Sequence, residues 1–440
     1  MARKNIYDKD LFYSFLKRFW VDNTIKCSYR KTEVHGLENI PEDGAIIFSP
    51  NHCNTLMDAL AVLRSYKGLA TFGARADMFR RPLFAKAMYF FRILPMVRQR
   101  DGLRNVLKNK DTQETIVETL ENNVRFCMYP EGTHRTKHSL QVLGKGAFRA
   151  ALAANEKFGD QKPMYIVPVG IEYGDYFRYR SSALVNFGEA INVTEFIKGL
   201  DTDNEAQMMD ALRKELAERM SQLITFIKAD EKYDGKWALT KMVAMNRKRA
   251  YGEFGTDLYE EMTYNREIVA GIEAACESEP EKMEEILKDA AEFEVKRKKK
   301  GISLYSFKKK SSPVMSAVGK GVAALLGLPY FLFSAVASLP MWAANEIIRS
   351  KVKDKAFRNT VSLGVKLAMT LILFPTYAAL SFCLAPWWAA LAFMLLWLPS
   401  FGYFYDYIEG CRRWISDIKL LKNKKLYKEF KSILKKYKNL

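Results

Sequence analysis

The most constraining feature of this 440-residue sequence is a set of three apolar stretches in its last third, at roughly 317–347, 361–384 and 386–407. The second and third are each long enough to cross a bilayer, which requires about 20 apolar residues per helix. They are joined at "LAPWW" without a charge at the tip, so we expect a tight helical hairpin. The first stretch contains glycines and two prolines, and basic clusters flank it on both sides. If both clusters are cytoplasmic the stretch cannot cross the membrane once, so we interpret it as a re-entrant or interfacial element.

The residues that flank the hairpin predict its orientation. Basic side chains cluster on both flanks, and the tail over 411–440 holds eleven basic residues against two acidic ones. Because Lys and Arg are retained on the cytoplasmic side, we predict a multi-pass membrane protein whose C-terminal tail faces the cytoplasm. Aromatic residues at expected interface depths disfavour the alternative of buried helices in a soluble protein. These are Trp387, Trp388, Trp397, Tyr403, Tyr405 and Tyr407.

The charge of the chain indicates an anionic partner. Lys and Arg number 69 against 50 Asp and Glu, which gives a net charge of +19, and 49% of the residues are hydrophobic, which excludes general disorder. The basic run "KRKKKGISLYSFKKK" over 296–310 directly precedes the apolar third, where attraction to anionic headgroups is favoured over a solvated linker. Much of the charge flanks apolar segments, so we expect membrane lipids as partners and no nucleic acid.

The six cysteines are widely scattered and include no CxxC pair. This spacing predicts neither a disulfide framework nor a zinc site. A reducing environment that faces the cytosol fits this cysteine usage best.

Between about residues 32 and 195, short apolar runs alternate with longer helical segments. The runs "GAIIFSP", "ILPMV", "VRFCMYP", "MYIVPVGIEY" and "ALVNFG" predict strands, and the rhythm indicates an α/β domain with a largely buried sheet. Residues 203–298 are rich in Glu, Lys, Met and Ala with helical periodicity. The sequence therefore predicts an amphipathic N-terminal helix, an α/β domain, a helical region with a basic linker, and a membrane region with a hairpin and basic tail, at 1–31, 32–200, 201–310 and 311–440.

The stretch "LFYSFLKRFWV" over residues 11–21 places aromatic side chains beside Lys17 and Arg18. This composition is typical of a helix that lies in a membrane interface. A helix docked on the following domain is an equally good interpretation.

A histidine and an aspartate follow the first predicted strand closely, in "NHCNTLMD" over residues 51–58. In one helix, side chains six residues apart would point in different directions. They can meet only if His52 lies in a turn and Asp58 in the first or second turn of a helix, with Asn54 or Thr55 as the N-cap. Such a pair can act as a general base and its orienting carboxylate, whereas alone each residue has an ordinary structural interpretation.

The second polar cluster is "YPEGTHR", residues 129–135, directly after an apolar run. A strand followed by such a turn presents backbone amides and the guanidinium of Arg135 to an oxyanion, for which phosphate is well suited. A hydroxyl is the natural partner of Glu131. In "RILPMVRQRDG", Arg98 or Arg100 could supply more positive charge.

Four blocks of this sequence together resemble the phospholipid/glycerol acyltransferase family. They are "NHCNTLMD", "ILPMVR", "YPEGTHR" with the downstream "GKGAFRAAL", and "IVPVGI", in the family's order and approximate spacing. The resemblance covers about residues 33–195 and implies a mixed sheet flanked by helices, here followed by the helical region and the membrane helices.

The resemblance also implies roles for individual residues. His52 and Asp58 form a dyad in which His52 is the general base on a glycerol hydroxyl that attacks an acyl thioester. Arg98 and Arg135 hold the phosphate of the acceptor. The acceptor site is shaped by Glu131, Gly132 and Thr133. No metal or cofactor is required, because acyl-CoA or acyl-ACP is a co-substrate with a good leaving group.

Two features depart from the common family pattern. Five residues separate His52 from Asp58, where the family usually has four, as in the branch of yeast-type glycerol-3-phosphate and dihydroxyacetone-phosphate acyltransferases. His134 lies between the threonine and the arginine of the third block, so either His134 or Arg135 could meet the phosphate.

The resemblance thus implies a membrane-bound O-acyltransferase that makes lysophosphatidic or phosphatidic acid, with its active site on the cytoplasmic face. Two alternatives remain open. One is acylation of another lysolipid, such as a lyso-aminolipid or a phospholipid in remodelling. The other is a non-catalytic membrane protein that binds anionic lipids.

Overall fold

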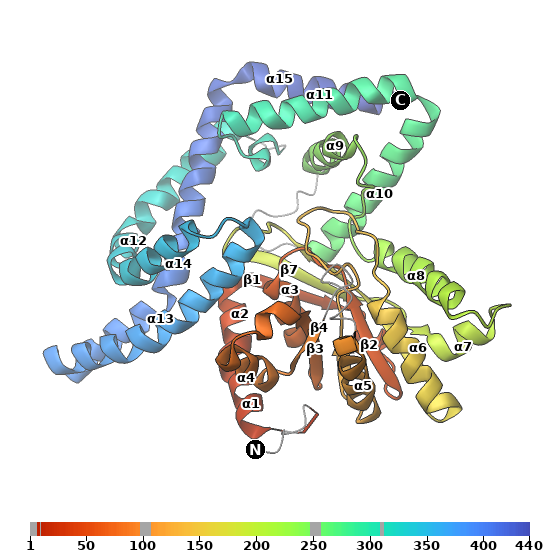
Figure 1. Cartoon of the computed structure of the whole chain (residues 1–440). Coiled ribbons are helices and arrows are strands. Elements are labelled where there is room, and N and C mark those ends of the chain that lie inside the picture. Colours follow the sequence, from red (N-terminus) through yellow and green to blue (C-terminus); the bar gives the residue numbers. More distant parts are fainter. Residues whose placement is uncertain (1–6, 9, 97–106, 247–256, 309–311) are drawn as a thin grey trace. The chain divides into compact units, whose positions relative to one another are not determined.

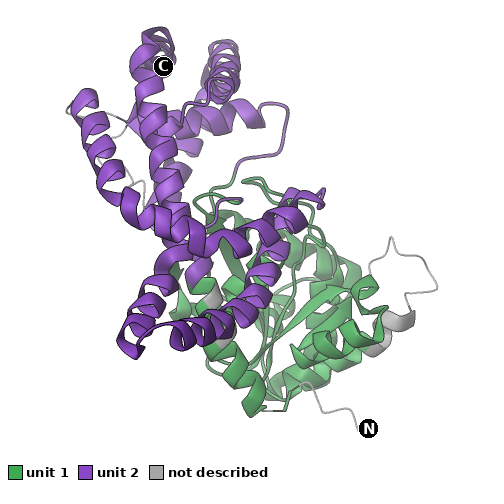
Figure 2. Ribbon diagram, turned by 90° about the vertical axis from the view of Figure 1, so that its left-hand side faces the viewer, with its two compact units in different colours: residues 1–26, 32–176, 182–226 green, residues 27–31, 177–181, 227–440 purple. Residues whose placement is uncertain are grey.

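The computed structural model describes residues 7–8, 10–96, 107–246, 257–308 and 312–440 (Figure 1). The chain divides into two compact units (Figure 2). Unit 1 comprises Met1–Lys26, Thr32–Tyr176 and Ser182–Phe226. Unit 2 comprises Cys27–Lys31, Phe177–Ser181 and Ile227–Leu440.

A mixed sheet is built in the order β1-β7-β6-β2-β5-β3-β4, and β8 also pairs with β6. The pairs that join β6, β2, β5, β3 and β4 are parallel, whereas β7 and β8 run antiparallel to β6. This confirms the predicted fold class. The strands are β1 Tyr29–His35, β2 Ala45–Pro50, β3 Ala70–Arg75, β4 Ile93–Met96, β5 Arg125–Cys127, β6 Met164–Tyr173, β7 Ser181–Phe187 and β8 Ile191–Asn192.

The sheet is apolar on both faces where its strands are parallel. All six residues of β2 are buried, which is why "AIIFSP" shows no alternation of polar and apolar residues. Ile47 of β2 lies opposite Phe126 of β5 and Ile166 of β6. All three side chains belong to the main core cluster of unit 1.

Helices of unit 1 pack against this sheet through single apolar faces. In α6, Ala147, Ala151 and Ala154 recur at helical spacing and are fully buried. Leu212 and Leu216 of α8 join the same core cluster. The helical elements up to Phe226 are α1 Leu11–Leu16, η1 Lys17–Val21, α2 Asp22–Ser28, η2 Leu37–Asn39, α3 Leu56–Ser65, η3 Ala76–Phe79, α4 Pro82–Phe90, α5 Leu107–Glu121, α6 Gly146–Phe158, η6 Gly159–Gln161, α7 Val193–Lys198 and α8 Glu205–Gln222.

Unit 2 is helical and has its own core. Phe430 is fully buried, with its ring centroid 5.7 Å from that of Phe293 and 4.9 Å from that of Phe307. Its helices after Phe226 are α9 Tyr233–Asn246, α10 Leu258–Ser278, α11 Pro280–Lys299, η7 Leu304–Phe307, α12 Pro313–Ser350, α13 Lys355–Leu384, α14 Trp387–Lys422 and α15 Lys424–Lys438.

Three of these helices, α12, α13 and α14, are long and apolar enough to cross a membrane, as judged by length and composition. The first apolar stretch, expected to be re-entrant or interfacial, forms one continuous helix, α12, with Pro329 inside it. Pro329 cannot donate a backbone hydrogen bond to the carbonyl of Leu325. The hydroxyls of Tyr403 and Tyr407 on α14 donate to two neighbouring carbonyl oxygens of α12, those of Gly327 at 2.9 Å and Ala324 at 2.8 Å.

Candidate active site

The site begins where the chain leaves β2. Asn51 directs its side-chain amide at the backbone of Ile171 in β6: Nδ2 donates to the carbonyl oxygen at 3.1 Å, and Oδ1 accepts from the N–H at 2.7 Å. The amide side chain thus takes the place of a peptide group in the ladder between β2 and β6. This contact holds the following turn against the sheet. Because the side chain of Asn51 makes these hydrogen bonds, the main chain can leave the strand direction at this point.

His52 lies in that turn, and Asp58 is the third residue of α3. His52 Nδ1 is 2.8 Å from Asp58 Oδ2, so the structure brings the two residues together across the five-residue gap. A carboxylate only accepts hydrogen bonds, so Nδ1 is the donor in this contact, and in the neutral imidazole Nε2 then has the lone pair. The His52 side chain is 18% exposed, whereas that of Asp58 is fully buried.

Asp58 is held by further donors on both of its oxygens. Oδ2 accepts the backbone N–H of Cys53 at 2.9 Å and of Asn54 at 2.7 Å. Oδ1 accepts the hydroxyl of Tyr173, the last residue of β6, at 2.9 Å. These hydrogen bonds use both oxygens of the buried carboxylate and hold it in one orientation toward the imidazole.

The longer spacing is accommodated at Thr55, which has φ of 52° and ψ of −128°. Positive φ is uncommon outside glycine and costs about 1–3 kcal/mol for such a residue. Thr55 occupies the expected N-cap position, but its side chain does not cap the helix. Asp58 instead binds the N–H groups of Cys53 and Asn54, and these bonds help to hold the strained turn.

Two aromatic rings border His52. The ring of Tyr129 stacks on the imidazole with centroids 4.3 Å apart, and His134 meets it edge-on at 5.8 Å. His134 is the additional residue of the third block, and the structure places its ring beside the dyad.

The carboxylate of Glu131 connects the turn that contains His52 to the loop over residues 139–141 by hydrogen bonds. Its Oε1 accepts the backbone N–H of His52 at 2.9 Å, and its Oε2 accepts that of Gln141 at 3.1 Å. Burial raises the pKa of Glu131. The preceding turn closes with a hydrogen bond from the Gly132 N–H to the Tyr129 carbonyl at 3.1 Å, and Gly132 has φ of 65°, which glycine adopts without strain.

Thr133 and Arg135 contact the loop over residues 139–141. Thr133 and Gln141 pair through two hydrogen bonds, at 3.1 Å and 2.7 Å. The backbone N–H of Arg135 donates to the His52 carbonyl at 3.0 Å, and Nη2 of the Arg135 side chain donates to the hydroxyl of Ser139 at 2.8 Å. Its Nε is buried without a hydrogen-bond partner among the described residues.

The predicted residues His52, Asp58, Glu131 and Arg135 therefore gather at the carboxyl ends of β2 and β5. Arg98 and Arg100 lie outside the described residues. Tyr173 was not among the residues predicted from the sequence. Its position at the end of a buried run that pairs with β2 was a usable signal, because parallel strands bring their carboxyl ends together.

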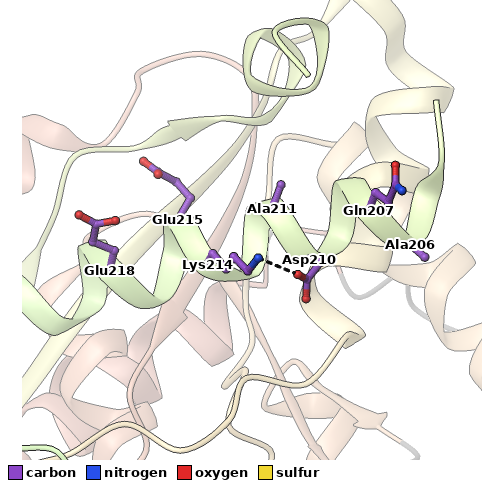
Figure 3. A pocket seen from close by; sticks show the side chains of 7 residues that line it. All are labelled: Ala206, Gln207, Asp210, Ala211, Lys214, Glu215 and Glu218. Carbon is purple, nitrogen blue, oxygen red and sulfur yellow. Dashed lines mark ion pairs between the residues drawn. The ribbon is translucent and has the colours of Figure 1, made fainter. Parts of the chain in front are cut away.

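A hollow with a different character lies along α8 (Figure 3). Its lining includes the carboxylates of Asp210, Glu215 and Glu218, and Lys214 pairs with Asp210 at 3.3 Å. Asp210 also pairs with Arg213, and Glu215 pairs with Arg219, so the cations along this hollow are already neutralised by carboxylates and would attract a phosphate weakly. None of the residues of the dyad or its loops lines it.

Residues 31–172 match the family model described as Acyltransferase. Among solved structures, the chain is similar to the 1-acyl-sn-glycerophosphate (LPA) acyltransferase PlsC from Thermotoga maritima, with 21% identity and a TM-score of 0.34, over 48% of this chain and 84% of that one. No curated protein matches.

Proposed function

We propose that the protein is a membrane-bound glycerolipid O-acyltransferase, on the premise that residues 31–172 match the Acyltransferase family model. It transfers a fatty acyl chain from acyl-CoA or acyl-ACP to a hydroxyl of glycerol phosphate or 1-acylglycerol-3-phosphate. The observation that carries the proposal is the 2.8 Å contact between His52 Nδ1 and the fully buried Asp58 carboxylate. It leaves Nε2 with a lone pair on the more exposed member of the pair.

In the proposed reaction, His52 Nε2 takes the proton of the acceptor hydroxyl as the hydroxyl oxygen bonds to the thioester carbonyl carbon. Asp58 stabilises the imidazolium that forms, without taking its proton. The tetrahedral intermediate then expels the thiolate, and the C–S bond breaks. The thiolate takes the proton from His52, which returns the dyad to its starting state.

Arg135 is the described residue best suited to the acceptor phosphate. Its Nε is buried without a hydrogen-bond partner among the described residues, and a phosphate oxygen that reached this N–H after a local rearrangement would satisfy the donor. Both oxygens of Glu131 accept backbone N–H groups, so we assign Glu131 a positioning role. Like Gly132 and Thr133, it fixes the loops around the acceptor site. A contribution from Arg98 remains a prediction.

The proposed chemistry needs no metal or cofactor. A thiol has a pKa of about 8.5, so its thiolate is a good leaving group without a Lewis acid. The acceptor and product are lipids or lipid precursors, and three membrane-length helices support a site at the bilayer. We place the active site and the basic tail on the cytoplasmic side, from the excess of Lys and Arg around the hairpin.

The decisive experiment is an acceptor screen on purified protein in vesicles, with acyl-CoA and acyl-ACP as alternative donors. We expect product from a phosphate-bearing acceptor, and a loss of about 10²–10⁴-fold in kcat for His52→Ala, as for removal of a general base. His35→Ala, which changes a histidine of β1, is the matched control. Turnover by His52→Ala at the wild-type rate would reject the assignment of the base.

The same screen tests the alternatives. Turnover confined to another lysolipid would keep the mechanism and change the acceptor. Binding of anionic vesicles without turnover of any acceptor by the wild-type protein would instead indicate a non-catalytic lipid-binding protein.

A further inference from the structure

One helix of unit 1 leaves its apolar side chains uncovered. α4 follows β3, and none of its nine residues is buried in the structure. Leu83 is 78% exposed, and Phe84, Met78 and Phe91 are exposed as well. Soluble surfaces rarely carry such contiguous apolar groups unless a partner covers them.

A second uncovered apolar stripe runs along α1 and η1. Leu11 is 89% exposed, and Phe15 and Phe19, which follow at intervals of four residues, are exposed as well. The rings of Phe15 and Phe19 lie 4.9 Å apart, so they share one side of the helix. Tyr13 is buried and attaches the helix to the rest of unit 1.

The two exposed elements lie side by side (Figure 1). The ring of Phe90 at the end of α4 lies 5.9 Å from that of Phe12 and 6.2 Å from that of Tyr13. The guanidinium of Arg92 stacks on Tyr13 at 4.9 Å. These contacts join α1 and α4 into a single apolar surface, which we call the α1–α4 surface. It comprises Leu11, Phe12, Phe15, Phe19, Met78, Leu83, Phe84 and Phe91.

The charges within the two segments that form this surface are all basic, and the acidic residues Asp10, Asp22 and Asp77 lie at the ends of these segments. Lys17 and Arg18 lie within the first stripe, and Arg80, Arg81 and Lys86 surround Leu83 and Phe84. Neither residues 11–21 nor residues 78–91 contain an acidic residue. Basic side chains beside exposed Phe and Leu match a bilayer, where the apolar groups enter the acyl boundary and the cations meet anionic headgroups. Protein interfaces instead deplete lysine from the apolar centre.

We propose that the α1–α4 surface docks unit 1 on the face of an anionic bilayer, as a second membrane contact besides the three membrane-length helices of unit 2. Leu83 and Phe84 enter the headgroup boundary together with the aromatic stripe of α1. Arg80, Arg81 and Lys86 remain at the level of the lipid phosphates. This contact does not depend on acyl transfer and can be tested without it.

The test uses the full chain in phosphatidylcholine vesicles with and without phosphatidylglycerol. In a background where the exposed Cys27 and Cys383 are replaced by serine, an environment-sensitive fluorophore is attached through Leu83→Cys. Nitroxide-labelled lipids then report its depth. The matched control is Leu37→Cys, which labels an exposed leucine of unit 1 on η2, outside the α1–α4 surface.

We expect the label at position 83 to shift to shorter emission wavelength and to be quenched at least about threefold more than the label at 37, because interfacial helices lie 5–10 Å inside the headgroup boundary. Adding Arg80→Glu and Arg81→Glu should reduce quenching most in vesicles with phosphatidylglycerol. Equal, water-like emission at both positions would overturn the proposal. So would a shift at 83 in detergent alone that grows with protein concentration, since this would identify a second copy of the chain as the occupant.

A functional measurement complements the spectroscopy. The double change Leu83→Glu and Phe84→Glu should raise the apparent KM for an acceptor embedded in vesicles about tenfold, by weakening interfacial binding. It should leave kcat with a detergent-dispersed acceptor unchanged. A loss of kcat in both assays would contradict a docking role. If the wild-type protein turns over no acceptor, only the proposed function fails. The fluorescence result still decides whether the α1–α4 surface docks on the bilayer.

Discussion

α3 and α4 both follow a parallel strand of the same sheet, yet their surroundings are opposite. α3 buries Met57, Asp58 and Val62, among other residues, whereas α4 buries none. Asp58 at the start of α3 binds the preceding turn and β6, while α4 touches the N-terminal helix through Phe90 and leaves Leu83 in solvent. A helix that follows a parallel strand can therefore be either enclosed or exposed, and its position in the topology does not decide which. In unit 1, one such helix positions a candidate dyad and the other presents an apolar surface.

The largest expected effect on this comparison comes from Asp58→Asn. An amide cannot accept from all the donors that Asp58 binds, and its own N–H₂ would face either the imidazole or backbone N–H groups. We expect kcat to fall by about 10³–10⁴-fold in the acyl-transfer assay, as for the carboxylate of a catalytic triad. Asp160→Asn, at an exposed aspartate, is the control. A loss below tenfold would show that α3 holds the site by packing alone.

Next in size is Tyr173→Phe, which removes the hydroxyl that joins Asp58 to β6. A hydrogen bond to a charged group contributes about 1.5–3 kcal/mol, so we expect a loss of about 10–100-fold in kcat and little change in KM. A positioning role also predicts a shifted pH profile of kcat, because the ionised Asp58 loses a donor. Tyr165→Phe on the same strand should leave both unchanged, and an identical response of the two variants would refute the role of Tyr173.

The packing difference between the helices predicts unequal stability effects. Val62→Ala on α3 removes two fully buried carbon atoms and should lower the free energy of unfolding by about 1–3 kcal/mol. Leu83→Ala on α4 should change it by at most about 0.5 kcal/mol in detergent. Chemical unfolding of both variants provides the measurement. Equal losses would show that α4 is packed in solution.

The smallest expected effect is a pH-dependent one at Glu131, which fastens the turn before α3. Burial raises its pKa, so over a window that starts near the ordinary value of about 4.3 the folded protein retains a proton that the unfolded chain releases. Stability from this group is complete below that window and is lost as pH rises through the raised pKa.

In Glu131→Gln this part of the pH dependence disappears. The difference in Tm between wild type and variant should therefore change across the window, in the direction of relatively lower wild-type stability at higher pH. Exposed Glu38→Gln is the control, for which a flat difference is expected. A flat difference for Glu131→Gln as well would contradict the raised pKa.

Much of the fold could be predicted because its signals are local. The apolar runs at residues 45–50 and 164–173 are β2 and β6, since buried parallel strands need apolar residues on both faces. β3, "ATFGAR", was not identified, because its second half is polar and glycine-containing. The first apolar stretch, expected to be re-entrant or interfacial, forms the single helix α12, which continues through Pro329 and Pro340.

The sequence by itself determined the strands β2, β4, β5, β6 and β7, the membrane-length apolar segments and the set of polar residues that follow β2 and β5. These depend on the period of apolar residues along a few turns or a few strand residues. Only the tertiary structure decided that Tyr173 meets Asp58, that Glu131 binds the His52 turn, and that α4 stays uncovered while α3 is enclosed. Contacts between residues 79 or 115 positions apart depend on strand register and packing, which no local pattern of residues specifies.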